Sequence, residues 1–357
     1  AAGARAAGGG GQGAGGAGRK ARRFADPTWQ ENPAYFWLQQ SYLLFGRLAQ
    51  DLVEAGTESS PDAKKLRLAA EIIVDALAPT NVLPGNPAAL KRAFETGGAS
   101  LYRGARNFLT DLATNKGMPR QVDRGAFTIG KDLAATPGKV VFRNDLIELL
   151  QYAPQTETVY EVPLLCSPPW INKYYVMDLA PQRSFIEWAV QHGHTVFAIS
   201  YRNADASMRD VTLDDYLVNG PSAALDAVEE ITGASEVNIV GLCLGGTLTA
   251  MLLAYLEKTS AHRVRSATLL NTFIDFSEPG VLGAFTDAGT IERLERAMRE
   301  KGFLASEDLA RTCTFLRCHD LAWNYVPINR TLRAPVPKFD SPVLIDGKVY
   351  STDETGV

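Results

Sequence analysis

The chain has 357 residues, 46% of them hydrophobic, and nearly balanced charge, with 36 Lys and Arg against 40 Asp and Glu. This composition supports a sizeable core in two or three domains and excludes a general nucleic-acid-binding protein. The four cysteines lack the spacing of a disulfide framework, and neither a run of eighteen apolar residues nor an apolar signal segment is present, so we expect a cytoplasmic protein without a membrane span.

The first 23 residues predict a disordered basic tail. Sixteen of the first 18 are Gly or Ala, and Arg19-Lys20-Ala21-Arg22-Arg23 follows. Residues 24–135 predict a helical domain, because apolar residues recur at helical spacing after three pairs of a capping residue and a proline. These pairs are Asn32-Pro33, Ser60-Pro61 and Asn86-Pro87.

Residues 136–276 change to an alternation of strands and helices. Short apolar stretches predict strands at 140–142, 161–166, 195–200, 236–240 and 265–270, and helical stretches lie near 182–191, 221–231 and 245–258. Alternation of this length predicts an α/β domain with a parallel sheet. We expect the functional site at the carboxyl ends of its strands.

One turn in this domain has the pattern of a nucleophile elbow. Gly241-x-Cys243-x-Gly245 stands between a predicted strand and a predicted helix, with cysteine where serine is usual. A side chain at either flanking glycine would collide with the neighbouring strand or helix. A lone cysteine is more often a buried apolar residue, but this succession favours a nucleophile whose thiolate is stabilised by the helix N-terminus. The N–H of Leu244 is then placed to stabilise an oxyanion.

The rest of the chain predicts a cap and a tail. Residues 277–326 are mostly helical in pattern, with a charged amphipathic stretch at 287–301, and a helical insertion here is typical of a lid. Residues 327–357 form a divergent, proline-punctuated segment in which we predict no regular element.

Several long motifs in register resemble polyhydroxyalkanoate synthases, most closely the class I enzymes of an actinobacterial kind. They are Pro168 to Tyr175 (PPWINKYY), Gly193 to Phe197 (GHTVF), Tyr201 to Met208 (YRNADASM) and Gly241 to Gly246 (GLCLGG). The similarity covers roughly residues 23–326, and it continues through 270–272 and 321–325.

The resemblance implies an α/β-hydrolase core with an N-terminal helical domain and a helical cap. It implies an acyltransferase that joins (R)-3-hydroxyacyl groups from coenzyme A thioesters into a polyester, with Cys243 carrying the growing chain as a thioester. Leu244 and Trp170 match the positions that supply the two oxyanion N–H groups in such folds. The resemblance further implies a homodimer at cytoplasmic polyester granules, and we expect neither a cofactor nor a metal.

The family's catalytic Asp and His have no matching positions in this chain. His262 lies too early after Cys243, His319 stands where the family pattern differs, and His192 and His194 precede the nucleophile and look structural. We therefore expect an incomplete form that lacks the last strands of the sheet, does not polymerise by itself and is poorly soluble because of an open sheet edge.

Two alternatives to a synthase remain open. One is a cysteine-type acyltransferase or thioesterase on the same fold, which would release an acid rather than a polymer. The other is a non-catalytic partner that docks on a full-length synthase or on a granule through its helical region and cap.

Overall fold

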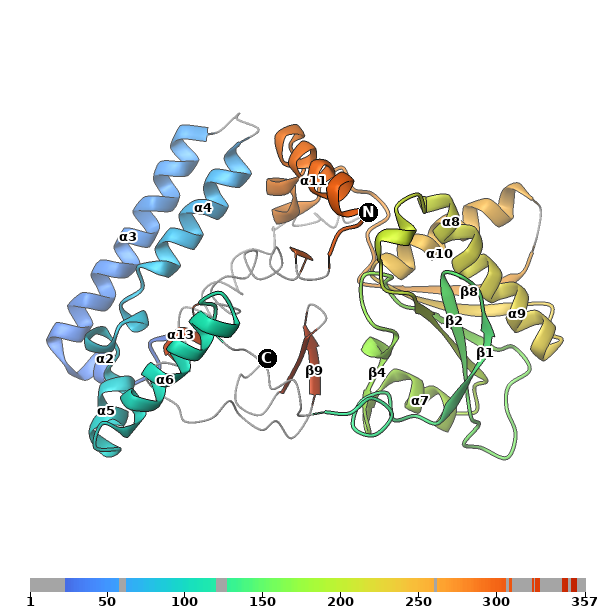
Figure 1. Cartoon of the computed structure of the whole chain (residues 1–357), viewed down its shortest axis with the longest axis horizontal. Coiled ribbons are helices and arrows are strands. Elements are labelled where there is room, and N and C mark those ends of the chain that lie inside the picture. The colour runs from blue at the N-terminus through green and yellow to red at the C-terminus, as the bar shows by residue number, and fades with distance from the viewer. Residues whose placement is uncertain are drawn as a thin grey trace, which may run out of the picture. The chain divides into compact units, whose positions relative to one another are not determined.

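The computed structural model describes residues 23–57, 62–119, 127–259, 262–305, 308–309, 323, 325–327, 342–345 and 348–351 (Figure 1). The chain divides into two compact units. One comprises residues 1–121 and 314–336, and the other comprises residues 122–313 and 337–357. No helix in the described ranges is long and apolar enough to cross a lipid bilayer.

The first unit is helical, as predicted for most of it. Its helices are α2 (Thr28–Glu31), α3 (Pro33–Thr57), α4 (Ala63–Ala76), α5 (Pro87–Glu95), α6 (Ala99–Thr114) and the short α13 (Tyr325–Pro327), with 3₁₀ turns η1 (Pro79–Asn81) and η2 (Leu83–Gly85). Two predicted caps are confirmed. The Asn32 side chain accepts a hydrogen bond from the N–H of Ala34 at 2.9 Å, and the Asn86 side chain accepts one from Ala89 at 3.0 Å. The third pair, Ser60-Pro61, lies outside the described residues.

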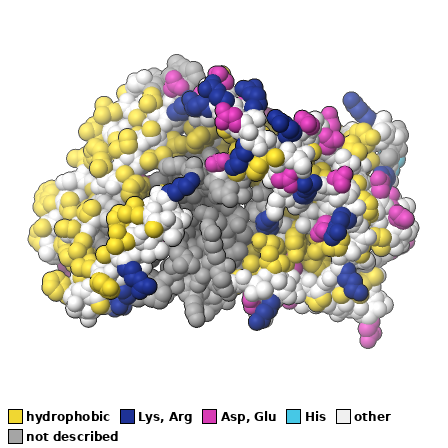
Figure 2. Space-filling view, in the orientation of Figure 1, with side chains coloured by type: hydrophobic (Ala, Val, Ile, Leu, Met, Phe, Trp, Pro, Cys, Tyr) yellow, Lys and Arg dark blue, Asp and Glu magenta, His cyan; other side chains and the backbone are white. Residues whose placement is uncertain are grey.

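The buried core of the helical unit is small. It is built around Trp29, which packs edge-on against Phe24 and Tyr35, and around Val74 of α4. Much apolar surface remains outside it: Figure 2 shows hydrophobic side chains gathered over α3 and α4, and Trp37 and Leu44 are exposed.

The second unit is built on a six-stranded mixed sheet in the order β1-β2-β6-β3-β7-β8. The strands are β1 (Gly138–Arg143), β2 (Ile147–Tyr152), β3 (Leu164–Ser167), β6 (Val196–Tyr201), β7 (Val237–Leu242) and β8 (Val264–Leu270). The predicted parallel arrangement is confirmed for β6, β3, β7 and β8. It is wrong at β2, which was not predicted and which runs antiparallel to both β1 and β6.

Helices cover both faces of this sheet. Successive strand residues point to opposite sides, so both faces carry apolar side chains that need a covering layer. Leu165 and its equivalents pack with Leu225 of α9 (Ala223–Thr232) and Leu248 of α10 (Leu244–Lys258). On the other face, Cys166 and its equivalents pack with Ile186 of α7 (Phe185–Gln191). The short α8 (Leu213–Leu217) joins α9 through a π-helical segment at Val218–Ser222.

Smaller elements complete the second unit. They are the hairpin β4 (Asp178–Ala180) and β5 (Arg183–Ser184), the 3₁₀ turns η3 (Tyr174–Met177), η4 (Ala206–Met208) and η6 (Gly280–Phe285), helix α11 (Ala288–Lys301) and the hairpin β9 (Pro342–Ile345) and β10 (Lys348–Ser351). Asp287 caps α11 by accepting a hydrogen bond from the N–H of Thr290, in agreement with the predicted start of this helix. The expectation of no regular element after residue 327 was wrong, because β9 and β10 form a hairpin there.

Candidate active site

Cys243 occupies a sharp strand-to-helix turn at the carboxyl end of β7. β7 ends at Leu242, α10 begins at Leu244, and Cys243 between them has φ 53° and ψ −122°. A non-glycine residue in such a conformation costs on the order of 1–3 kcal/mol, so the surrounding structure must hold it in place. One restraint is the N–H of Cys243, which donates to the carbonyl oxygen of Leu270 in β8 at 2.9 Å. The side chain of Cys243 is exposed.

The glycines around Cys243 are required by contacts with neighbouring backbone and side chains. A Cβ on Gly241 would lie 2.5 Å from the Cα of Gly246, and one on Gly245 would lie 1.9 Å from the carbonyl oxygen of Ser167. A Cβ on Gly246 would lie 2.0 Å from the Oγ1 of Thr272. Distances below 3.0 Å cannot be accommodated without a shift, so β3, β7 and α10 approach each other closely only because these positions lack side chains.

The N-terminus of α10 lies directly beside the thiol of Cys243. The first four N–H groups of a helix have no acceptor within it. Here those of Gly246 and Thr247 donate to the carbonyl oxygen of Cys243 at 3.0 and 3.2 Å. The N–H of Leu244 opens the helix next to Cys243, where the positive end of the helix dipole favours an anion. The role of Leu244 as an oxyanion donor stays a prediction.

The loop after β3 is tied to the same helix. Ser167 lies beside Gly241 in the β3–β7 register, and its buried hydroxyl donates to the carbonyl oxygen of Gly245 at 3.2 Å. Three residues later, Trp170 is partly buried, and its ring centroid lies 5.6 Å from that of Tyr216 in α8. The hydrogen bond of Ser167 and the ring contact of Tyr216 were not predicted, although Ser167 directly follows a predicted strand.

The described histidines lie away from the carboxyl edge of the sheet. His192 and His194 precede β6, and His262 is exposed in the loop that precedes β8, so all three lie near the amino ends of parallel strands. Six strand residues separate the two edges by about 20 Å. His192 stacks on Trp188 with ring centroids 4.3 Å apart, and His194 packs against Tyr160 at 4.9 Å. His319 lies outside the described residues.

A second thiol in this unit contrasts with Cys243. Cys166 in β3 is fully buried, and burial raises the pKa of its thiol to about 12. A buried, protonated thiol is a poor nucleophile, so Cys166 is a packing residue. Within the described ranges, no group of three or more His, Cys, Asp or Glu side chains is placed to hold a metal ion.

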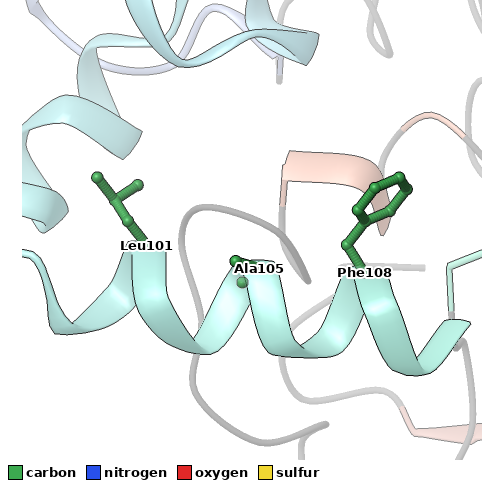
Figure 3. A pocket seen from close by; sticks show the side chains of 4 residues that line it. Leu101, Ala105 and Phe108 are labelled. Carbon is green, nitrogen blue, oxygen red and sulfur yellow. The ribbon is translucent and has the colours of Figure 1, made fainter.

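A pocket in the helical unit carries no catalytic chemistry. It is lined by Leu101, Gly104, Ala105 and Phe108, which form one side of α6 at helical spacing (Figure 3). None of these side chains can donate a proton, accept one or attack a carbonyl group. The pocket is therefore apolar surface left open beside α6.

Comparisons with known proteins match both parts of the chain. Residues 20–189 match the family model described as the N-terminus of poly-beta-hydroxybutyrate polymerase, and residues 167–340 match the alpha/beta hydrolase fold. The chain is 43% identical over 319 residues to a poly(3-hydroxyalkanoate) polymerase of Methylorubrum extorquens, covering 88% of this chain and 53% of that protein. It is 38% identical over 341 residues to a poly(3-hydroxyalkanoate) polymerase subunit of Cupriavidus necator, covering 94% and 56%.

A third relative, poly(3-hydroxyalkanoate) polymerase 2 of Ectopseudomonas oleovorans, is 41% identical over 319 residues, which cover 89% of this chain and 57% of that protein. The chain thus spans about half the length of the curated relatives that it matches. The matched length includes the helical region, the sheet and the turn at Cys243.

Proposed function

Over the length that it spans, the chain belongs to the poly(3-hydroxyalkanoate) polymerase family, and on this premise we propose that Cys243 is the nucleophile of an acyl transfer that builds a polyester. The observation that carries the proposal is the exposed thiol of Cys243, held at positive φ between β7 and the N-terminus of α10. This conformation is strained, and strain of this kind clusters at functional sites.

The proposed reaction has two acyl transfers. In the first, the Cys243 thiolate attacks the thioester carbonyl of an (R)-3-hydroxyacyl-coenzyme A, so that a bond forms to Sγ, the bond to the coenzyme A sulfur breaks, and coenzyme A leaves as its thiol after taking up a proton. In the second, the 3-hydroxyl of an incoming unit attacks the Cys243 thioester, loses its proton and releases the Cys243 thiol. Each carbonyl oxygen becomes an anion during attack, and the N–H groups of Leu244 and Trp170 are the proposed donors to it.

The two steps differ in what they require of a base. Attack by a thiol needs only its thiolate, whereas attack by a hydroxyl needs a positioned proton acceptor. No described histidine lies at the carboxyl edge of the sheet. Because the family's catalytic Asp and His have no matching positions in this chain, we propose that it accepts one acyl group at Cys243 and turns over slowly.

The number of coenzyme A molecules released per chain tests this expectation. The full chain is mixed with (R)-3-hydroxybutyryl-coenzyme A, the reaction is quenched in acid, and free coenzyme A is separated and quantified by liquid chromatography. A rapid release of about one equivalent, absent in Cys243→Ala, is expected from single acylation. Sustained release with polymer formation would instead place a working base in this chain.

The alternative function is that of a cysteine-type acyltransferase or thioesterase on the same fold. It would carry the same acyl group on Cys243 but pass it to water or to another small acceptor. The products separate the two, because a thioesterase yields free 3-hydroxybutyric acid and a synthase yields ester-linked oligomers.

The homodimer and the location at polyester granules are also proposals, and similarity to the polymerases supports them. Light scattering after size-exclusion chromatography tests the first. A mass that stays monomeric at all concentrations would contradict it. Sedimentation with isolated granules, compared with the supernatant, tests the second.

A further inference from the structure

The last residue of β8 and the chain that follows it expose large apolar side chains. We call Leu270, Phe273, Ile274 and Phe276 the apolar strip; their exposed fractions are 39%, 51%, 66% and 51%. The rings of Phe273 and Phe276 lie next to each other, with centroids 5.8 Å apart. Four large exposed apolar side chains thus lie within seven residues, and a local concentration of this kind marks a binding surface more often than scattered single residues do.

Hydrogen bonds hold the apolar strip beside the nucleophile turn. The N–H of Cys243 donates to the carbonyl oxygen of Leu270 at 2.9 Å, and the hydroxyl of Thr247, in the first turn of α10, donates to the carbonyl oxygen of Phe273 at 2.8 Å. Thr272 packs against Gly246 so closely that no Cβ fits there. The strip is therefore anchored at both ends of the turn that carries the thiol.

We propose that the apolar strip is the surface on which the acyl chain carried by Cys243 lies. This inference rests on the proposed function and identifies where its substrate binds. A chain attached to Sγ is held at a high effective concentration near the strip, so even modest apolar contacts order it. The occupant is the hydroxyacyl or polyester chain, which is aliphatic and uncharged.

The charge within the strip argues against coenzyme A as the occupant. Asp275 stands between Ile274 and Phe276, and hydrogen bonds from Ser277 to its carboxylate lower the pKa of that group. Asp275 is therefore anionic at neutral pH and repels the phosphates of coenzyme A, whereas an uncharged ester chain is not repelled.

A series of N-alkylmaleimides tests the strip without requiring catalysis. The Cys243 thiolate adds to the maleimide double bond, and the neighbouring carbon takes a proton from water, whether or not the chain transfers acyl groups. The rate of modification of the Cys243 peptide is measured by mass spectrometry for methyl, ethyl, butyl and hexyl reagents, relative to the rates with glutathione. Full burial of each added methylene would raise the rate by up to about four-fold.

The variant Phe273→Ser/Phe276→Ser should flatten this dependence on chain length to that of glutathione. Phe273→Ser alone should reduce the slope, and it serves if the double variant does not fold. Trp188→Ser is the matched control, because Trp188 is also 51% exposed but lies on α7, before β6. It should keep the wild-type slope.

Three results would overturn the proposal. The first is a wild-type protein whose modification rate rises with alkyl-chain length no more than that of glutathione. The second is a Trp188→Ser variant that loses this dependence on chain length as fully as the phenylalanine variants do. The third is a Cys243 modification rate that falls as the protein concentration rises, because a second copy covers the strip. Failure of the proposed function looks different: the maleimide slope persists while (R)-3-hydroxybutyryl-coenzyme A leaves Cys243 unmodified.

Discussion

Cys243 and Cys166 differ in exposure, although both lie in the same α/β unit. Cys243 is exposed at the start of α10, and Cys166 is enclosed in β3 between Ala198 of β6 and Val240 of β7, on the face covered by α7. The first is suited to chemistry and the second to packing. Each difference leads to a measurable consequence.

Burial of Cys166 should make the fold sensitive to alkali. Its pKa is raised from 9.0 to about 12, so the protonated thiol stabilises the fold fully below pH 9, and this stabilisation is lost as the pH rises towards 12. Between pH 7 and pH 10 the thiol should account for a loss of about 1.4 kcal/mol in the free energy of unfolding. Urea titrations should show that Cys166→Ala loses less over this interval. An identical loss in both proteins would contradict the assignment.

The glycine at position 245 should not tolerate even one added methyl group. Gly245→Ala places a Cβ 1.9 Å from the carbonyl oxygen of Ser167, and overpacking of this kind costs about 2–3 kcal/mol. Gly56→Ala is the control, because its Cβ meets no atom within 4 Å and alanine favours a helix by about 0.5–1 kcal/mol. Thermal melts should therefore move in opposite directions. A Gly245→Ala protein as stable as wild type would refute the close approach of β3 and α10.

The sequence predicts the turn at Cys243 well but not the residues that restrain it. Gly241 and Gly245 follow from the pattern itself, since a tight turn admits no side chain there. Asn271, at φ 47°, and Thr272, against Gly246, were not predicted as part of the site because their roles depend on β8 lying beside β7. The pairing of β7 with β8 joins segments that are separated in the sequence, so a local pattern does not predict it.

At the scale of elements, α5 is fixed by a single buried side chain. Asn86 accepts a hydrogen bond from the N–H of Ala89 and donates one to the carbonyl oxygen of Thr80 at 2.9 Å. One side chain thus caps the helix and ties it to the 3₁₀ turn η1.

Replacement of Asn86 should separate these two contributions. Asn86→Ala removes both hydrogen bonds and should cost about 1–2 kcal/mol in the free energy of unfolding. Asn86→Ser keeps a capping hydroxyl but not the bond to Thr80, so chemical denaturation should place it between wild type and Asn86→Ala. If both variants were as stable as wild type, the cap would contribute nothing.

Strand β2 shows why an element can be missed. Ile147, Leu149 and Tyr152 are buried, and the residues between them are partly exposed. Period-two alternation is broken by Leu150-Gln151, so the pattern is weaker than in the buried strands, which are almost continuously apolar. The alternation of Ile147, Glu148 and Leu149 was nevertheless a usable signal.

At the scale of the whole molecule, each unit leaves apolar surface uncovered. In the helical unit, Trp37, Leu44, Leu48 and Leu52 are exposed along α3, and in the other unit β8 is the edge strand of the described sheet. Composition could not predict this, because 46% hydrophobic residues is compatible with a fully covered core.

The exposed face of α3 should promote self-association. Leu44→Gln/Leu48→Gln removes apolar surface at two positions one turn apart and leaves helix propensity nearly unchanged. Light scattering should show less concentration-dependent association than in wild type. Val159→Gln, at a single exposed valine of the other unit, should have no such effect. Equal association in all three proteins would show that the α3 face is not responsible.

The most direct test of the account is to identify the residue that becomes acylated. The full chain is incubated with (R)-3-hydroxybutyryl-coenzyme A, quenched in acid and digested, and the peptide that contains Cys243 is analysed by mass spectrometry. We predict one hydroxybutyryl group on Cys243, none on Cys166, and no coenzyme A release in Cys243→Ala. An unmodified Cys243 together with coenzyme A release that survives in Cys243→Ala would contradict the assignment of the nucleophile.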